Sequence, residues 1–168
     1  AFYGFPPVRV YSTGTTTDRG ATVRSFDLEE ALKQPVKVER VVTADEMWKH
    51  YTYFIKKVLP VAESAKVKLS LHPDDPPIPM IGGMARIFSS FEGFRRVMED
   101  VAPSPYHGLL FCVGCWAEGG EAMGKDTVES IRYFGSRGKI FTVHFRNVSS
   151  PLPSFHETFI DTGYLDMY

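Results

Sequence analysis

The sequence predicts an α/β fold in which parallel strands alternate with helices. From Thr43 onward, three amphipathic stretches alternate with three short apolar runs, Val67–Leu71, Leu109–Cys112 and Ile140–His144. Near-continuous apolar strands separated by helices are typical of a parallel sheet with right-handed crossovers. The pattern fits a flavodoxin-like sheet or part of a (β/α)₈ barrel. A full barrel needs about 250 residues, so a chain of 168 residues could supply only roughly half of one.

The chain is expected to form one domain with two unequal parts. Residues 1–42 are expected to be rich in loops, with a possible strand at Val8–Tyr11 and a threonine- and glycine-rich loop at Ser12–Gly20. That loop is either solvated or close to a polar substrate. A short helix is expected over Asp27–Gln34, before Pro35. Residues 43–168 are expected to hold the βα units and the functional site.

Three helices are expected in this larger part. The first begins with a capping box at Thr43 and Glu46, the second with a capping box at Ser89 and Glu92, and the third is capped by Asp126. Residues 113–125 contain four glycines and are expected to form a loop. Residues 147–168 show no clear periodicity. Because the chain opens without Met and stops at Tyr168 without a tail, we expect it to be incomplete at both ends.

Each of the three predicted strands ends in a residue that can bind a metal ion. The strands end in His72, Cys112 and His144. Neighbouring parallel strands lie about 5 Å apart and end on the same rim, so these side chains are expected to converge. Imidazole and thiolate together suit Mn, Fe, Co or Zn, in a site that keeps one position open. Taken singly, each histidine could be an ordinary polar residue and the cysteine inert packing.

Two other interpretations of the cysteines are weaker. Cys112 and Cys115 form a CxxC pair. A redox motif of this kind opens a helix, whereas this pair is expected to enter a glycine-rich loop. A zinc ribbon requires a second such pair, and the sequence has only two cysteines.

Residues close to these strand ends could bind an anionic, hydroxyl-rich substrate. Arg146 and Asn147 follow His144 directly, and an arginine can pair with a carboxylate through two hydrogen bonds. Arg86 is a second candidate, although it could equally be a surface residue. Asp75, beside Asp74, could accept a hydroxyl group or support a metal ligand, or could simply cap its loop.

Composition excludes several classes of function. The net charge is −1 with both signs interspersed, so nucleic-acid binding and a basic membrane-binding surface are not expected. No apolar run approaches the roughly 18–20 residues of a membrane-spanning helix. Two cysteines do not make a disulfide framework, so we expect a cytoplasmic protein.

The motifs LHPDDPP, GGMARIF, FCVG, VHFRN and FIDTGYLDMY resemble those of the mannonate dehydratase family. The resemblance implies a (β/α)₈ barrel that converts D-mannonate to 2-keto-3-deoxy-D-gluconate in hexuronate (glucuronate) catabolism, with Mn²⁺ or Fe²⁺ bound. It places the metal ligands at His72, Cys112 and His144. It also implies a fourth ligand, an Asp, and an acid/base His, both beyond Tyr168. We expect a small sugar-acid substrate and a homodimer. The position of Cys115 is often Thr in this family.

The implied reaction removes water from the sugar acid. A base would take the proton at C2, an acid would protonate the departing C3 hydroxyl, and Arg146 or Arg86 would hold the carboxylate. The alternatives are a sugar isomerase or epimerase on a similar metal-binding barrel, or an inactive half-barrel fragment.

Overall fold

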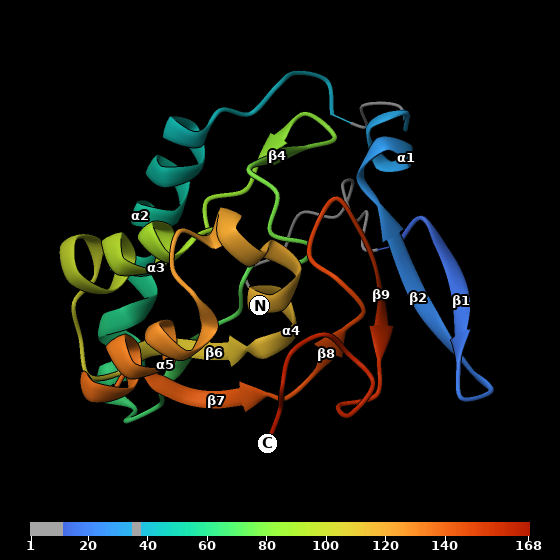
Figure 1. Cartoon of the computed structure of the whole chain (residues 1–168). Helices are drawn as coiled ribbons and strands as arrows, with labels where there is room; N and C mark the ends of the chain where they lie inside the picture. Colours follow the sequence, from blue (N-terminus) through green and yellow to red (C-terminus); the bar gives the residue numbers. More distant parts are fainter. Residues whose placement is uncertain (1–11, 35–37) are drawn as a thin grey trace.

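The computed structural model describes residues 12–34 and 38–168. Helices pack on one parallel sheet, and a separate antiparallel sheet lies beside them (Figure 1). The possible strand at Val8–Tyr11 lies outside the described residues.

The parallel sheet carries the predicted site residues. It consists of β3 (Leu69–Leu71), β6 (His107–Cys112) and β7 (Ile140–His144), in the order β3-β6-β7, and both pairings are parallel. The central strand β6 is almost entirely buried, as expected for a strand covered on both faces. Cys112 pairs with His144, so the two residues end neighbouring strands on the same rim. The prediction of an α/β fold with a parallel sheet is confirmed.

The long helix α2 (Ala44–Ser64) packs on this sheet through one apolar face. It begins with the predicted capping box, in which the Thr43 hydroxyl accepts from the Glu46 backbone and the Glu46 carboxylate accepts from the Thr43 backbone. Tyr51 and Ile55 are buried on the inner face, within the core that the sheet and helices share.

The other two predicted helices are also present. α3 (Phe91–Arg95) is capped by Ser90 and not by the predicted Ser89, whose hydroxyl donates to the Arg86 carbonyl instead. It continues into the π-helical turn η1 (Arg96–Val101). α5 (Thr127–Ser136) is capped by Asp126, as predicted. Both pack against the core that α2 and the parallel sheet share.

A further helix replaces the loop expected over residues 113–125. α4 (Val113–Gly119) follows β6 without a break and leads into the 3₁₀ helix η2 (Gly120–Met123). Every residue of α4 is buried, and Trp116 stacks on Phe111 with ring centroids 4.4 Å apart. Glycine costs a helix up to about 1 kcal/mol per residue, and burial of the whole segment outweighs that cost.

The N-terminal part is less rich in loops than expected. β1 (Gly14–Asp18) and β2 (Ala21–Asp27) form an antiparallel hairpin, and α1 (Leu28–Leu32) follows where a short helix was predicted. Arg19 and Gly20 form the turn with φ of 47° and 83°, which suits a two-residue hairpin loop. The threonines expected in a loop are β-branched and favour the strand that they form.

The C-terminal segment, expected to lack regular structure, completes this second sheet. β8 (Asn147–Val148) and β9 (Ser154–Thr158) join the hairpin in the order β1-β2-β9-β8, with antiparallel pairings. Phe26 stacks on Phe155 with centroids 5.5 Å apart, in a second core that also contains Ala117 of α4. The second sheet is therefore anchored to the helix that follows Cys112.

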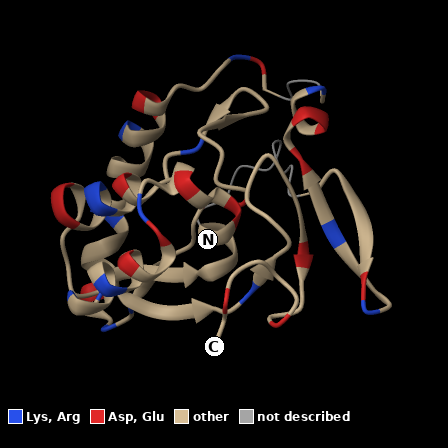
Figure 2. Ribbon diagram, viewed as in Figure 1, with Lys and Arg blue, Asp and Glu red and all other residues tan. Residues whose placement is uncertain are grey.

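A short hairpin and the distribution of charge complete the described structure. β4 (Met80–Ile81) and β5 (Met84–Ala85) pair antiparallel, and Val42 bridges to Met84. Acidic and basic segments are interleaved over the ribbon (Figure 2). No helix in the described part of the chain is long and apolar enough to cross a membrane.

Candidate metal centre

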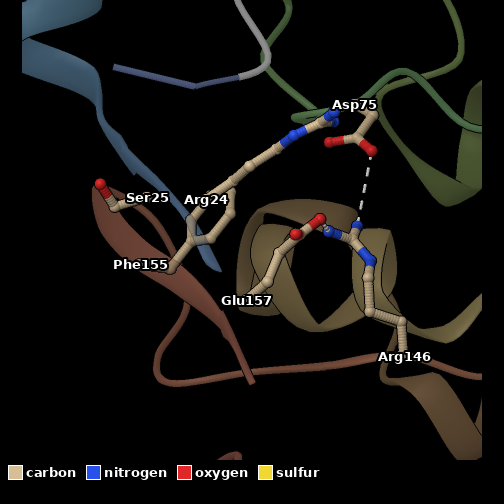
Figure 3. A pocket seen from close by; sticks show the side chains of 6 residues that line it. All are labelled: Arg24, Ser25, Asp75, Arg146, Phe155 and Glu157. Carbon is tan, nitrogen blue, oxygen red and sulfur yellow. Dashed lines mark hydrogen bonds and ion pairs between the residues drawn. The ribbon is translucent and has the colours of Figure 1, made fainter. Parts of the chain in front are cut away.

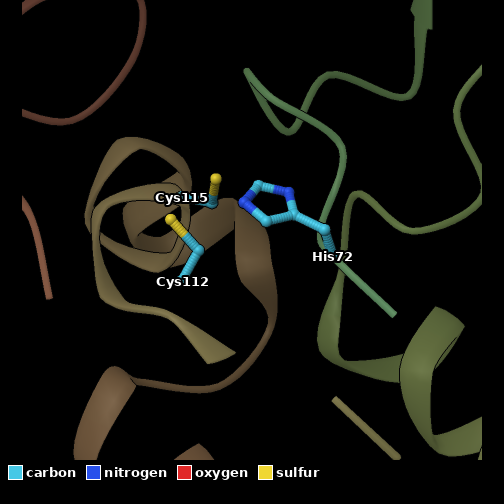
Figure 4. Close-up of side chains that lie close together, drawn as sticks. All are labelled: His72, Cys112 and Cys115. Carbon is cyan, nitrogen blue, oxygen red and sulfur yellow. The ribbon is translucent and has the colours of Figure 1, made fainter. Parts of the chain in front are cut away.

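His72 lies in the loop directly after β3, where the prolines that follow it end the strand. Its Nδ1 lies 2.7 Å from the carbonyl oxygen of Pro73. A carbonyl only accepts hydrogen bonds, so Nδ1 carries a proton and the neutral imidazole keeps its lone pair on Nε2. Figure 4 shows the ring pointing from its loop toward the sulfur of Cys112. A histidine fixed in this way is prepared to bind a metal ion through Nε2.

The surroundings shift the pKa values of both His72 and Cys112. Burial lowers the pKa of His72, but its hydrogen bonds with Cys112 and with the Pro73 carbonyl outweigh burial, and the pKa is raised. A hydrogen bond from Cys115 lowers the pKa of Cys112 to about 3, against the effect of burial and with help from His72 and Arg146. Cys112 is therefore a thiolate, the form that binds metal.

His144 approaches Cys112 from the neighbouring strand β7. Its Nδ1 lies 3.4 Å from the Cys112 sulfur, at the exposed end of β7. The ring centroids of His72 and His144 are 6.3 Å apart, so the two imidazoles are neighbours beside the sulfur. The structure thus brings the three predicted ligands together around Cys112. Two imidazoles and a thiolate fit a divalent ion of borderline softness.

A second sulfur belongs to the same cluster. Ligand atoms of His72, Cys112 and Cys115 all lie within 4.8 Å of one another, and both cysteines are free and buried (Figure 4). Burial and the hydrogen bond to Cys112 raise the pKa of Cys115 well above its usual value. The cysteine pair opens helix α4, contrary to the expectation that it enters a loop.

Arg146 neutralises the acidic groups beside the cluster. Its Nη2 donates to Glu118 and lies 3.5 Å from Asp75, and its Nη1 donates to Glu157 at 3.0 Å. The same Nη2 lies 3.9 Å from the sulfur of Cys112 and 3.6 Å from that of Cys115. Although burial opposes its charge, the surrounding acidic groups raise the pKa of Arg146 further. Its two terminal nitrogens are therefore engaged within the protein, whereas its Nε has no hydrogen-bond partner among the described residues.

Glycine at position 114 permits this arrangement. A Cβ atom on Gly114 would overlap the guanidinium of Arg146, starting with Nε. Helix α4 can therefore approach Arg146 closely enough for Glu118, which is fully buried, to pair with it.

Two further predicted substrate-binding residues lie in the loop that carries His72. Arg86 is buried, with Nε 3.3 Å from Asp74 and Nη2 donating to the backbone carbonyl of Asp75 at 2.9 Å. Asp74 accepts from the backbone of Phe88 at 2.9 Å. These contacts hold the loop after β3, so the structure places Arg86 within the protein and leaves the carboxylate of Asp75 at the site.

Asn147 also makes internal contacts. Its side-chain amide donates to the carbonyls of Ile160 and Leu165 at 3.0 and 2.9 Å, and its oxygen accepts from the backbone of Val148 at 2.9 Å. The residue is fully buried. It therefore fastens the C-terminal segment beside β8.

Figure 3 shows a small polar pocket next to the cluster. Asp75, Arg146 and Glu157 line it, and Arg24 reaches over it from β2 of the N-terminal hairpin, pointing toward Asp75. No local pattern indicated Arg24 or Glu157 here, because both arrive through the antiparallel sheet. Glu118 was missed because helix α4 was not predicted, whereas the CxxC spacing was a visible signal for Cys115.

Comparison with known proteins gives a consistent result. The D-mannonate dehydratase (UxuA) family model matches residues 22–168. A mannonate dehydratase of Thermotoga petrophila is 37% identical over 134 residues, which cover 79% of this chain and 36% of the relative. Mannonate dehydratase 2 of Halalkalibacterium halodurans is 35% identical over 130 residues, covering 77% of this chain and 36% of the relative.

A solved structure agrees with the sequence matches. The crystal structure of mannonate dehydratase from Streptococcus suis serotype 2 superposes with a TM-score of 0.76 and 28% identity, over 90% of this chain and 45% of that chain. The chain thus spans about a third of the length of the curated relatives that it matches. The family model covers most of the chain, including all three strand-end residues, and the chain therefore belongs to the D-mannonate dehydratase family.

Proposed function

We propose that this protein dehydrates D-mannonate to 2-keto-3-deoxy-D-gluconate in hexuronate (glucuronate) catabolism. Membership of the family supports the reaction and its sugar-acid substrate. The observation that carries the proposal is the position of the Cys112 thiolate, in contact with both His72 and His144 on one rim of the parallel sheet. Packing alone does not require a thiolate beside two imidazoles.

His72 through Nε2, Cys112 through its sulfur and His144 would hold a divalent ion, which we propose to be Mn²⁺ or Fe²⁺. Such an ion supplies positive charge next to the oxygen atoms of the sugar acid as the C2 proton leaves. The described residues prepare this site: the Pro73 carbonyl fixes the tautomer of His72, and Arg146 balances the charge of Cys112. An Asp ligand and an acid/base His are expected beyond Tyr168.

The remaining predicted residues are proposed to bind or support the substrate. Asp75 presents its carboxylate to the pocket and could accept a sugar hydroxyl. Arg146 and Arg86 already pair with carboxylates of the protein. They would have to release these partners to bind the substrate carboxylate, so their contacts favour positioning roles. Asn147 would act through its hold on the C-terminal segment.

We also propose that the three parallel strands belong to a (β/α)₈ barrel. Their consecutive order, the helices packed on them and the similarity to the Streptococcus suis enzyme support this proposal. Within the described residues β7 pairs only with β6, and Val143 and Phe145 near its end are more than half exposed. Further strands of a barrel would cover these side chains. The cytoplasmic location and the homodimer stay predictions.

The reaction is tested by incubating the purified protein with D-mannonate and Mn²⁺. We expect a 2-keto-3-deoxy acid, seen as a new carbonyl signal and a mass lower by one water. A product of unchanged mass would indicate an isomerase or epimerase instead.

The metal site is tested separately by metal analysis of Cys112→Ala and His144→Ala. Each variant should lose bound metal by at least roughly ten-fold, because a ligand contributes more than the groups that merely orient it. His50→Ala, which changes an exposed residue of α2, is the matched control and should retain the metal. Full metal content in either ligand variant would contradict the proposed site.

A further inference from the structure

One close group of metal-binding atoms in the described structure differs from the set that the family resemblance implies. It joins His72 and Cys112 with Cys115, whose ligand atoms all lie within 4.8 Å of one another. Figure 4 shows the two sulfurs side by side at the start of α4, with the imidazole pointing toward them. The resemblance assigns ligands at His72, Cys112 and His144 and gives Cys115 no role.

The spacing of the two cysteines suits chelation of one ion. Residues three apart lie on the same side of a helical turn, and two cysteines separated by two residues are a common half of a metal site. Neither cysteine forms a disulfide, and both are fully buried. No large rearrangement is needed to bring both sulfurs to one ion.

His144 can complete the set. It approaches Cys112 at 3.4 Å from the neighbouring strand β7, and its ring centroid lies 6.3 Å from that of His72. An ion bound next to the Cys112 sulfur could therefore take His144 as a fourth ligand beside His72, Cys112 and Cys115, and these four residues form the Cys₂His₂ set of tetrahedral zinc sites.

Charged neighbours would tolerate a second thiolate. The Nη2 atom of Arg146 lies 3.6 Å from the Cys115 sulfur and 3.9 Å from that of Cys112, so it can donate to either while that sulfur binds an ion. The divalent ion would itself offset the negative charge that the second sulfur adds beside Asp75 and Glu118.

We propose that Cys115 is a metal ligand, and that the resulting two-sulfur site prefers thiophilic ions such as Zn²⁺ and Co²⁺ over Mn²⁺. The proposal rests on the metal site of the proposed function and adds to it one ligand and a metal preference. Thiolates favour zinc and its neighbours, whereas oxygen-rich sites favour manganese. Loss of Cys115 should shift the preference back toward Mn²⁺.

Titration with Co²⁺ tests the number of sulfur ligands, because each thiolate contributes a sulfur-to-cobalt absorption in the near ultraviolet. We expect the intensity of this absorption band in the unaltered protein to be about twice that in Cys115→Ser. We also expect the ratio of Zn²⁺ affinity to Mn²⁺ affinity to fall at least roughly ten-fold in the variant. Cys115→Thr should behave like Cys115→Ser. Circular dichroism confirms that both variants are folded.

The failures of the two proposals are distinguishable. Equal bands in the unaltered protein and in Cys115→Ser overturn the role of Cys115 and leave a site with one thiolate. Absence of the band from the unaltered protein overturns the metal site as a whole. X-ray absorption of the Zn²⁺-loaded, unaltered protein needs no variant: two sulfur neighbours support the proposal, and one or none contradicts it.

Discussion

Single side chains in this protein are held by neighbours that decide their protonation. His107 is the clearest case away from the candidate site. Its Nε2 lies 3.0 Å from the Tyr51 hydroxyl, and its Nδ1 lies 3.1 Å from the Ala102 carbonyl, in the core beneath α2. Burial lowers its pKa below the ordinary value of 6.5. The folded protein thus keeps this imidazole neutral where the unfolded chain would protonate it.

Stability should therefore depend on pH through His107. Above about pH 6.5, the neutral form of His107 contributes fully to the free energy of unfolding. This contribution is lost as the pH falls through 6.5 toward the lowered pKa of the folded state, because the unfolded chain then binds more protons. Urea unfolding at pH 7.5 and pH 5 should show a larger loss of stability for the unaltered protein than for His107→Gln. Equal losses in the two proteins would contradict this role.

Helix α4 is the element on which the site depends, and glycine sets how closely it packs. A Cβ atom on Gly114 would overlap the Arg146 guanidinium, whereas one on Gly135 of α5 would meet only a distant contact, the Ile140 Cδ1 atom at 3.9 Å. Gly114→Ala should destabilise the protein by roughly 1–3 kcal/mol through overpacking and weaken metal binding. Gly135→Ala, the matched control, should stabilise α5 by about 0.5–1 kcal/mol. Urea unfolding and metal titration measure both, and equal effects would contradict the packing argument.

The sequence predicted those elements whose signals are local. The apolar runs that end in His72, Cys112 and His144, and the caps at Thr43 and Asp126, can each be recognised within a few residues. Helix α4 could not be predicted, because its glycines disfavour a helix and burial against distant strands stabilises it. Strands β8 and β9 are short and exist through pairing with the N-terminal hairpin, more than a hundred residues away in sequence. The Arg19-Gly20 turn was a signal that could have revealed that hairpin.

At the scale of the whole molecule, Arg146 joins the two sheets. It contacts Asp75 after β3, Glu118 on α4 and Glu157 on β9. Its own position was visible in the sequence, but its partners were not, because they come from three separate elements. Tertiary structure therefore converts a candidate substrate-binding residue into a central ion pair.

Replacement of Arg146 by Met should destabilise the protein by roughly 3–5 kcal/mol, since the fully buried Glu118 would lose its counter-charge. Changing Glu118 to Gln in the same protein should recover part of that loss. Arg19→Ala breaks an exposed ion pair with Asp161 and should cost less than about 1 kcal/mol. Urea unfolding compares the three variants, and a loss for Arg146→Met no larger than for Arg19→Ala would refute the central ion pair.

The most direct test of the metal centre is a crystal of the protein grown with Mn²⁺ and measured at a wavelength where manganese scatters anomalously. With Mn²⁺ as the only divalent ion supplied, we expect one strong anomalous peak within bonding distance of His72, Cys112 and His144, because a preference for Zn²⁺ lowers the affinity for Mn²⁺ without abolishing its binding. A manganese peak elsewhere in the protein, or none beside the Cys112 sulfur, would contradict the account.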